Sequence, residues 1–262
     1  MRKVLGVLVV LVSAGIVLSI YFGAYRGAPP AHTPLPSTAG DVQAPVAAAE
    51  APPRYVLEQE KQAASLPALN ASDGAVKAAL RALWKHGPFE LFRFDGFIRR
   101  VVATVDNLPR RELAERLRPA APAPGHFRTA GNPDLMVVSP QNFGRYSQYM
   151  EFVKAADPAT LVAAYVRFYP LFQQAYEELG YPNGYFNDRL IEVIDHLVAA
   201  PQLPADARLR QPKIFYQFAD DDLEQRSAGE KILMRVGNEN AAVIKAKLRE
   251  IRAELVRRSR AQ

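Results

Sequence analysis

The chain has 262 residues, a formal net charge of +6 and no cysteine. Without cysteine it can form neither a disulfide nor a thiolate metal site, and it cannot be a lipoprotein anchored through an N-terminal cysteine. The ~190 residues that follow a proline-rich N-terminal region can bury the core of one domain, and no internal repeat indicates a solenoid.

The first predicted element is a transmembrane helix over residues 4–25. Residues 4–22 are apolar and uncharged, and about 20 apolar residues in a helix cross the ~30 Å hydrocarbon core of a bilayer. Arg2 and Lys3 precede this run. The positive-inside rule therefore places residues 1–3 in the cytoplasm and the rest of the chain on the other side.

A cleaved signal peptide is the alternative interpretation of the same run. Cleavage requires small residues in an A-x-A-like pattern soon after the apolar core, and Phe22 and Arg26 stand in this region. The length of the run and these two side chains favour an uncleaved anchor.

Residues 26–64 are predicted to be a linker. They are rich in alanine and proline and carry too little bulky apolar surface to offset the entropy of ordering. Such a stretch is typical of an extended, partly polyproline-like tether, which either gives the following domain its reach or is a tolerated spacer. We expect the domain to occupy residues 65–258.

The domain is predicted to be mainly α, with a small patch of short β-strands, behind the one transmembrane helix. Capping residues and helical apolar spacing predict helices that begin near Ser72, Phe97, Ser139, Asp157, Tyr185, Ser227 and Asn238. Strands are expected over 126–129, 135–138 and 213–218, and the last of these is the strongest candidate.

The helix that follows Asp157 has the widest apolar face, which indicates a central position. Its stripe consists of Leu161, Tyr165, Phe168, Phe172, Tyr176 and Leu179. Pro170 lacks a backbone donor, so we expect a kink or a break there, and Gly180 is expected to close the helix. The predicted core includes Trp84, Phe168, Phe172, Ile194 and Leu248.

The sequence carries no recognised catalytic or metal-binding motif. Its four histidines do not fall at ligand spacing, and no nucleophile elbow, P-loop, dinucleotide fingerprint or H-E-x-x-H pattern is present. Asp188, Glu192 and Asp195 share one face of a predicted helix, which admits a cation site or an acid/base pair. Because this face lies opposite the apolar stripe, a solvated surface is favoured, and we expect no catalytic residue, metal or cofactor.

The turn and helix start at residues 181–189 form the predicted binding surface. It is assigned to Tyr181, Asn183, Tyr185, Asn187, Asp188 and Arg189. Loops on rigid scaffolds often carry function, and Asn183-Gly184 suits a turn with positive φ. The alternative is architectural: the two tyrosines pack inward, and Asp188 caps or salt-bridges its own helix.

The last predicted helix concentrates positive charge in Lys245, Lys247, Arg249, Arg252, Arg257, Arg258 and Arg260. Because the predicted topology puts this helix outside the cytoplasm, anionic lipid headgroups or cell-wall polymers are better candidate ligands than nucleic acid. The simpler interpretation is a solubilising face whose basic residues favour the helix C-terminus.

Several long strings occur together that resemble one family. They are IRRVVATVDNLPR over 98–110, YPLFQQAYEELGYPNGYFNDRLIEVIDHL over 169–197 and QPKIFYQFADDDLE over 211–224. With shorter strings on either side, residues 66–255 resemble DUF3014, a bacterial domain of unknown function. The resemblance implies one domain behind one N-terminal membrane segment, and it brings no activity and no catalytic residue.

The sequence therefore predicts a single-pass protein of the bacterial inner membrane with a periplasmic domain. We expect this domain to bind or scaffold an envelope protein or a cell-wall polymer. An envelope hydrolase that uses carboxylates such as Asp188 or Glu192 is the alternative, and a closed pocket lined by carboxylates would favour it. A purely structural role in a larger complex is a third possibility.

Overall fold

The computed structural model describes residues 52–57, 66–83, 89–113, 115–132 and 134–261. The predicted anchor over 4–25, most of the predicted linker over 26–64 and Trp84 lie outside the described residues. Within them, no helix combines the length and the apolar character that crossing a membrane requires.

The described chain is mainly helical, as predicted. Its α-helices are α2 (Asp73–Leu83), α3 (Phe97–Asn107), α4 (Ser147–Ala155), α5 (Pro158–Glu178), α6 (Phe186–Ala199), α7 (Asp221–Glu224), α8 (Ala228–Arg235) and α9 (Asn238–Arg258). Short 3₁₀ helices are η2 (Leu69–Ala71), η3 (Phe89–Leu91), η4 (Glu115–Leu117) and η5 (Pro140–Tyr146). The strands are β1 (Tyr55–Leu57), β2 (Thr129–Ala130), β3 (Val137–Val138), β4 (Leu209–Arg210), β5 (Gln217–Phe218) and β6 (Ser259–Ala261).

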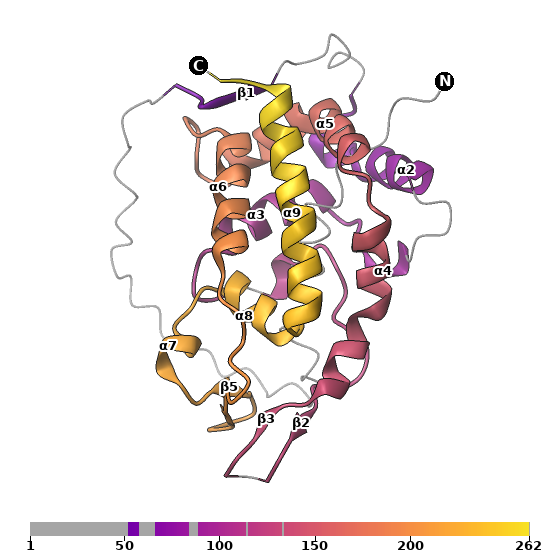
Figure 1. The fold of residues 1–262 in the computed structure, drawn as a ribbon. Coiled ribbons are helices and arrows are strands. Elements are labelled where there is room, and N and C mark those ends of the chain that lie inside the picture. The colour runs from indigo at the N-terminus through magenta and orange to yellow at the C-terminus, as the bar shows by residue number, and fades with distance from the viewer. Residues whose placement is uncertain (1–51, 58–65, 84–88, 114, 133, 262) are drawn as a thin grey trace, which may run out of the picture.

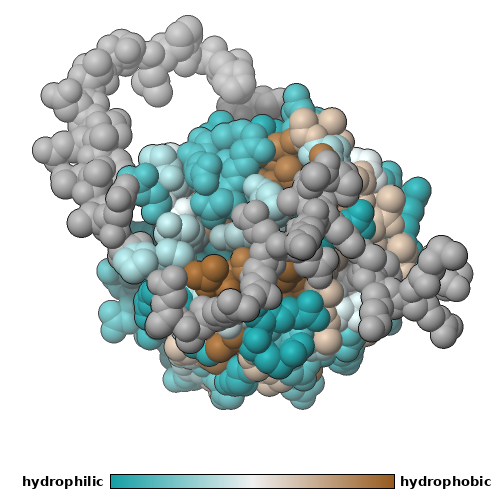
Figure 2. All heavy atoms as spheres, turned by 90° about the horizontal axis from the view of Figure 1, so that it is seen from above, coloured by the Kyte–Doolittle hydropathy of each residue, from teal (hydrophilic) through white to brown (hydrophobic). Residues whose placement is uncertain are grey.

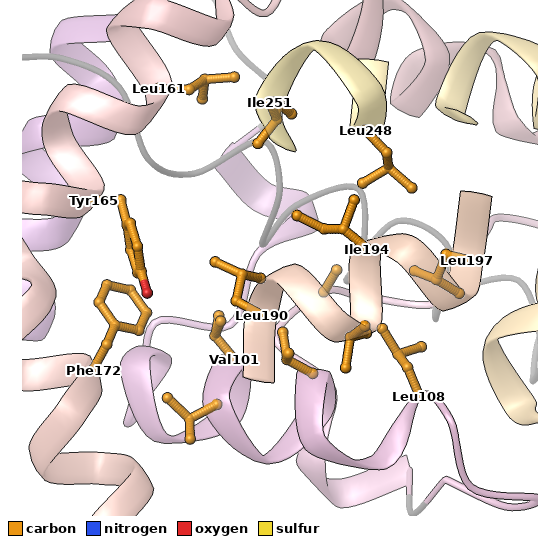
Figure 3. Close-up of a cluster of buried hydrophobic side chains, with 14 of the residues drawn as sticks. Val101, Leu108, Leu161, Tyr165, Phe172, Leu190, Ile194, Leu197, Leu248 and Ile251 are labelled. Atoms are coloured by element: carbon orange, nitrogen blue, oxygen red, sulfur yellow. The ribbon is translucent and has the colours of Figure 1, made fainter. Parts of the chain in front are cut away.

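Four helices enclose the main core. α9 runs along most of the molecule, with α6 beside it and α3 behind it (Figure 1), and α5 packs on both α3 and α9. Figure 3 shows apolar side chains from all four helices pointing toward one another. Phe168, Phe172, Ile194 and Leu248 are all buried, as predicted from their helical spacing.

Capping residues begin several helices as the sequence predicted. Ser139 accepts a hydrogen bond from the backbone N–H of Gln141 at the start of η5, and Asp157 accepts one from Thr160 at the start of α5. Ser227 and Glu230 form a reciprocal capping box on α8. Each of these side chains satisfies one of the free backbone N–H groups in the first turn of its helix.

Two local predictions are wrong, and one of the two outcomes expected at Pro170 is excluded. Pro170 does not break α5, which is continuous from Pro158 to Glu178, so of the expected kink or break the break is wrong. The residue that caps α9 is Gly237 and not Asn238. Only Gln217 and Phe218 of the predicted strand over 213–218 are extended in a ladder, because the register of β4 with β5 leaves residues 211–216 as the connecting loop.

The strands lie at opposite ends of the molecule. At one end β1 pairs with β6, so the start and the finish of the described chain meet in an antiparallel ladder. Figure 2 looks onto this end, where hydrophobic residues gather between hydrophilic ones. At the other end the β2–β3 and β4–β5 hairpins lie side by side (Figure 1), joined by the backbone bridge of Val137 with Arg208.

Candidate functional site

The predicted binding segment, residues 181–189, connects α5 to α6. Gly180 has a φ of 116° and closes α5 as predicted. The positive φ expected at Gly184 is not found, and this expectation was wrong. Gly184 has a different role: a Cβ there would lie 2.9 Å from Cε1 of Tyr176, so the missing side chain lets the turn approach that ring.

Tyr181 and Arg189 converge on Asp106, a carboxylate that is buried in α3. The Tyr181 hydroxyl donates to Oδ2 of Asp106 at 3.2 Å, and its ring stacks on Tyr176 with centroids 4.6 Å apart. Arg189 donates from Nε to Oδ1 of Asp106 at 3.1 Å and from Nη2 to its backbone oxygen at 2.9 Å. These two residues therefore tie the turn to α3.

Asn187 and Asp188 hold the N-terminal strand of the same chain. Oδ2 and Oδ1 of Asp188 accept hydrogen bonds from the backbone N–H groups of Arg54 and Tyr55, at 2.7 and 2.9 Å. The buried Asn187 donates from Nδ2 to the backbone oxygen of Tyr55 at 2.9 Å. We call this arrangement, together with the β1–β6 ladder, the strand clamp.

Two of the predicted residues face solvent. Asn183 is exposed, and Tyr185 is 39% exposed. Tyr185 lines a shallow cleft of about 330 Å³, together with Arg54, Tyr55, Tyr176, Asp188, Arg189, Ile191, Glu192 and Asp195. Burial raises the pKa of the Tyr176 hydroxyl in this cleft to about 12, because the charged phenolate is disfavoured where water is excluded.

The carboxylate face of α6 is engaged in ion pairs and hydrogen bonds. Glu192 pairs with Arg189 at 3.0 Å, Asp195 pairs with Arg252 of α9, and Asp188 belongs to the strand clamp. Burial alone would lower the pKa of Arg189, but its contacts with Glu192 and Asp106 raise it. Among the described residues, no group of histidines and carboxylates is arranged to hold a metal ion.

The basic side chains of α9 are largely paired as well. Lys247 contacts Glu250, Arg257 and Arg258 both contact Glu254, and Arg252 contacts Asp195. Four of the seven basic residues expected to concentrate charge on this helix therefore contact three carboxylates within the described chain, which fits the solubilising interpretation.

A larger groove lies between α4 and the N-terminal end of α9. It has a volume of about 770 Å³. Its apolar lining comes from Val138, Pro140, Phe143, Met150, Leu203, Pro204 and Val236, and its exposed polar rim from Ser147, Glu151, Lys154, Asn238 and Glu239. An apolar floor with a polar rim is the usual composition of a binding site for a ligand or a peptide.

The two walls of this groove are fixed by asparagines. Asn238 accepts from the backbone N–H of Leu203 and donates to its backbone oxygen, both at 2.9 Å. Asn240 donates to the backbone oxygens of Val236 at 3.0 Å and of Phe143 at 3.4 Å. The groove is therefore formed before any partner arrives, which reduces the entropy that binding must overcome.

Gly237 forms part of the floor, and a residue with a side chain would be strained there. Its φ is 92°, a conformation that side chains rarely adopt, and a Cβ would lie 2.7 Å from the ring of Phe143. This close approach brings η5 against the start of α9. Nothing in the sequence pattern indicates that residues near 143, 203 and 238 meet.

The structure shows a mainly helical domain with a groove between α4 and α9. A family model described as a protein of unknown function, DUF3014, matches residues 97–252. The chain belongs to this family. In the same comparisons no curated protein and no solved structure matches it.

Proposed function

We propose that the protein is a membrane-anchored binding module of the bacterial cell envelope. Residues 4–25 form its single-pass anchor in the inner membrane, residues 26–51 its tether, and the helical domain faces the periplasm. Support comes from the uncharged run over 4–22 and the basic residues before it. Nucleic acid is not an expected partner on that side of the membrane.

The groove between α4 and α9 is the proposed binding site, and its geometry is the observation that carries the proposal. The apolar floor suits side chains of a protein segment better than the hydroxyl-rich surface of a sugar polymer. Lys154 and Glu151 at the rim can pair with charges of either sign on that segment. The proposed partner is therefore an envelope protein that inserts apolar side chains between Phe143 and Leu203.

The strand clamp gives this binding module a defined orientation. The tether enters the domain at β1, beside the C-terminal end of α9, whereas the groove lies at the N-terminal end of the same helix. A helix of 21 residues spans about 32 Å. The groove is thus held well away from the point at which the tether is attached.

No structural feature in the described part of the chain favours a carboxylate hydrolase, the alternative from the sequence. Its candidate residues Asp188, Glu192 and Asp195 line the shallow cleft beside the strand clamp, and each is engaged by a backbone group or an arginine. We therefore retain the binding module alone.

The test is site-specific photo-crosslinking in the intact chain in its native membranes. A photoreactive residue at Ser147 on the groove rim is expected to form an adduct with an envelope protein. The same residue at the neighbouring Gln148, which is exposed on α4 but does not line the groove, is the matched control. Equal labelling at both positions, or none at Ser147, would contradict the proposal.

A further inference from the structure

The shallow cleft beside the strand clamp differs from the groove in its lining. Of its nine lining residues three are tyrosines and five are charged, and the single aliphatic one, Ile191, is buried. An aliphatic ligand therefore finds little to contact, whereas the tyrosine rings and the charged groups offer flat apolar faces beside hydrogen-bond donors and acceptors. None of these residues lines the groove, so the cleft is a separate surface.

Tyr185 holds an aromatic ring at the mouth of this cleft. It is 39% exposed, and its hydroxyl makes no hydrogen bond with another described residue. One amide fixes the backbone on both sides of it: Gln173 donates from Nε2 to the backbone oxygen of Gly184 at 2.7 Å and accepts from the N–H of Phe186 at 2.9 Å. The ring therefore stands on a rigid base, and a ligand that stacks on it orders little of the chain on binding.

The carboxylates of the cleft are already engaged but not covered. Asp188 accepts from two backbone N–H groups, Glu192 pairs with Arg189, and Asp195 pairs with Arg252. A cation would have to displace an arginine or a backbone group, which argues against a cation site. The side chains of Glu192 and Asp195 are still 68% and 48% exposed, so their oxygens keep lone pairs that can accept hydrogen bonds from a ligand.

The charges at the cleft cancel. Two arginines and three carboxylates line it, and Arg252, which pairs with Asp195, balances the remaining carboxylate. The buried Asp106 behind the cleft is balanced by Arg110, with which it pairs at 2.7 Å. Because the lining carries no net charge, the cleft attracts neither anions nor cations, and its ligand is expected to be uncharged.

We infer that this cleft binds an uncharged sugar chain. A pyranose ring has a flat C–H face that packs on an aromatic ring, and its hydroxyls donate to carboxylate oxygens. Tyr185 offers the first contact, and Glu192 and Asp195 offer the second. From Asp188 to Asp195 the carboxylates follow one face of α6 over about 10 Å, which exceeds the width of one pyranose ring. The ligand that matches this row is therefore a chain of sugars.

The cell wall is the expected source of this chain, and this step alone rests on the proposed function, which puts the domain in the periplasm. The cleft lies where the tether enters the domain, because Arg54 and Tyr55 belong to both the cleft and the strand clamp. Sugar bound there leaves the groove, at the opposite end of α9, open to its protein partner.

The test measures saturation transfer by NMR from the purified full chain, in lipid nanodiscs, to soluble tetrasaccharides. Chitotetraose, an uncharged chain of N-acetylated amino sugars, should receive saturation. Its deacetylated, cationic counterpart should receive much less, because the carboxylates of the cleft are engaged. Cellotetraose, which is uncharged and lacks acetamido groups, identifies the source. Binding of both uncharged chains assigns the cleft to sugar rings in general, binding of chitotetraose alone assigns it to acetamido sugars such as those of the cell wall, and binding of cellotetraose alone excludes the cell wall.

Variants of Tyr185 test whether the sugar binds in this cleft. Tyr185→Ala should weaken the binding of chitotetraose several-fold, and Tyr185→Phe, which keeps the ring, should retain it. Phe215→Ala is the matched control and should change nothing, since Phe215 is an aromatic residue of similar exposure, 44%, at the hairpin end. Circular dichroism verifies that all three variants keep their helical content.

Three results overturn the inference: no saturation of either uncharged chain, a preference for the cationic tetramer, or binding that survives Tyr185→Ala. Failure of the proposed function is seen separately, in the crosslinking at Ser147, because sugar binding to the purified chain depends neither on the groove nor on the side of the membrane that the domain faces.

Discussion

Asp188 is best understood as the residue that docks the start of β1 onto the helical domain. Its two carboxylate oxygens accept from the backbone of Arg54 and Tyr55, and the neighbouring Asn187 holds the Tyr55 carbonyl. Recognition through backbone groups does not depend on the side chains of residues 54 and 55. Whether Asn183 and Tyr185, which remain exposed, also contact a partner stays a prediction from the sequence.

We predict that Asp188→Ala opens the strand clamp locally and leaves the helical core folded. Hydrogen bonds to a charged group contribute about 1.5–3 kcal/mol when shielded, and partial exposure of this site reduces the figure to about 1–2 kcal/mol. Hydrogen exchange at the amides of Arg54 and Tyr55 should therefore become roughly tenfold faster or more. Glu192→Ala, on the exposed face of the same helix, is the control and should leave these two amides unchanged.

At the level of elements, the sequence predicted the helices well, but it predicted poorly which residues pair in strands and which segments contact one another. The α3, α5, α6, α8 and α9 helices follow from apolar spacing and from caps such as Ser227, because both signals are local. Residues 213–218, KIFYQF, were predicted to be a strand because of their high β-propensity, but residues 213–216 belong to a loop, and propensity cannot show which residues a partner strand will leave unpaired.

The candidate groove could not be predicted from the sequence, because local patterns do not show which distant segments contact one another. It depends on Asn238 and Asn240 bonding to residues near 203 and 143, which are 35 and 97 positions away. Asn238 was interpreted as a helix cap, the common local role of asparagine. In the structure its side chain hydrogen-bonds to both the backbone N–H and the backbone oxygen of Leu203, and no local pattern predicts such a contact.

The tyrosines of the helical core make stability depend on alkaline pH. Tyr165 is 1% exposed, its hydroxyl has no hydrogen-bond partner, and burial raises its pKa well above 10. Burial also raises the pKa values of Tyr146 and Tyr176, each to about 12. In the unfolded chain these hydroxyls ionise near pH 10. Between about pH 10 and pH 12 the folded chain therefore keeps protons that the unfolded chain loses.

We predict that the free energy of unfolding falls as pH rises from about 10 to 12. Below pH 10 the buried tyrosines are protonated in both the folded and the unfolded chain, so the free energy of unfolding keeps its full value. Above pH 10 only the unfolded chain ionises. Each such tyrosine then lowers the free energy of unfolding by about 1 kcal/mol at pH 11. Urea denaturation at pH 8 and pH 11 measures the loss. Tyr165→Phe, which removes a hydroxyl without a partner, should reduce that loss at little cost to stability at pH 8.

Viewed whole, the molecule has two different ends. The strand clamp joins residues 54–57 to the C-terminal strand at one end, and the groove and the two hairpins lie toward the other. Since α9 spans the distance between them and packs on α4, α5, α6 and α8, the groove lies at the end of the domain opposite to the strand clamp. This separation is what the proposed binding module requires, because its attachment and its binding site would then not obstruct each other.

The last prediction concerns the side of the membrane on which this domain lies. Alkaline phosphatase folds only in an oxidising compartment, because it needs its disulfides. A fusion of this enzyme after Gln262 should therefore be active, and a reporter that requires the cytoplasm should be inactive at the same position. The positive-inside bias of Arg2 and Lys3 is the physical reason, and replacing both with glutamate should weaken the preference for this orientation.

Intact mass spectrometry of the membrane-bound chain should show the N-terminus retained. A mature N-terminus near Ala28 would establish a cleaved signal peptide in place of the anchor, and the reverse reporter pattern would place the groove in the cytoplasm.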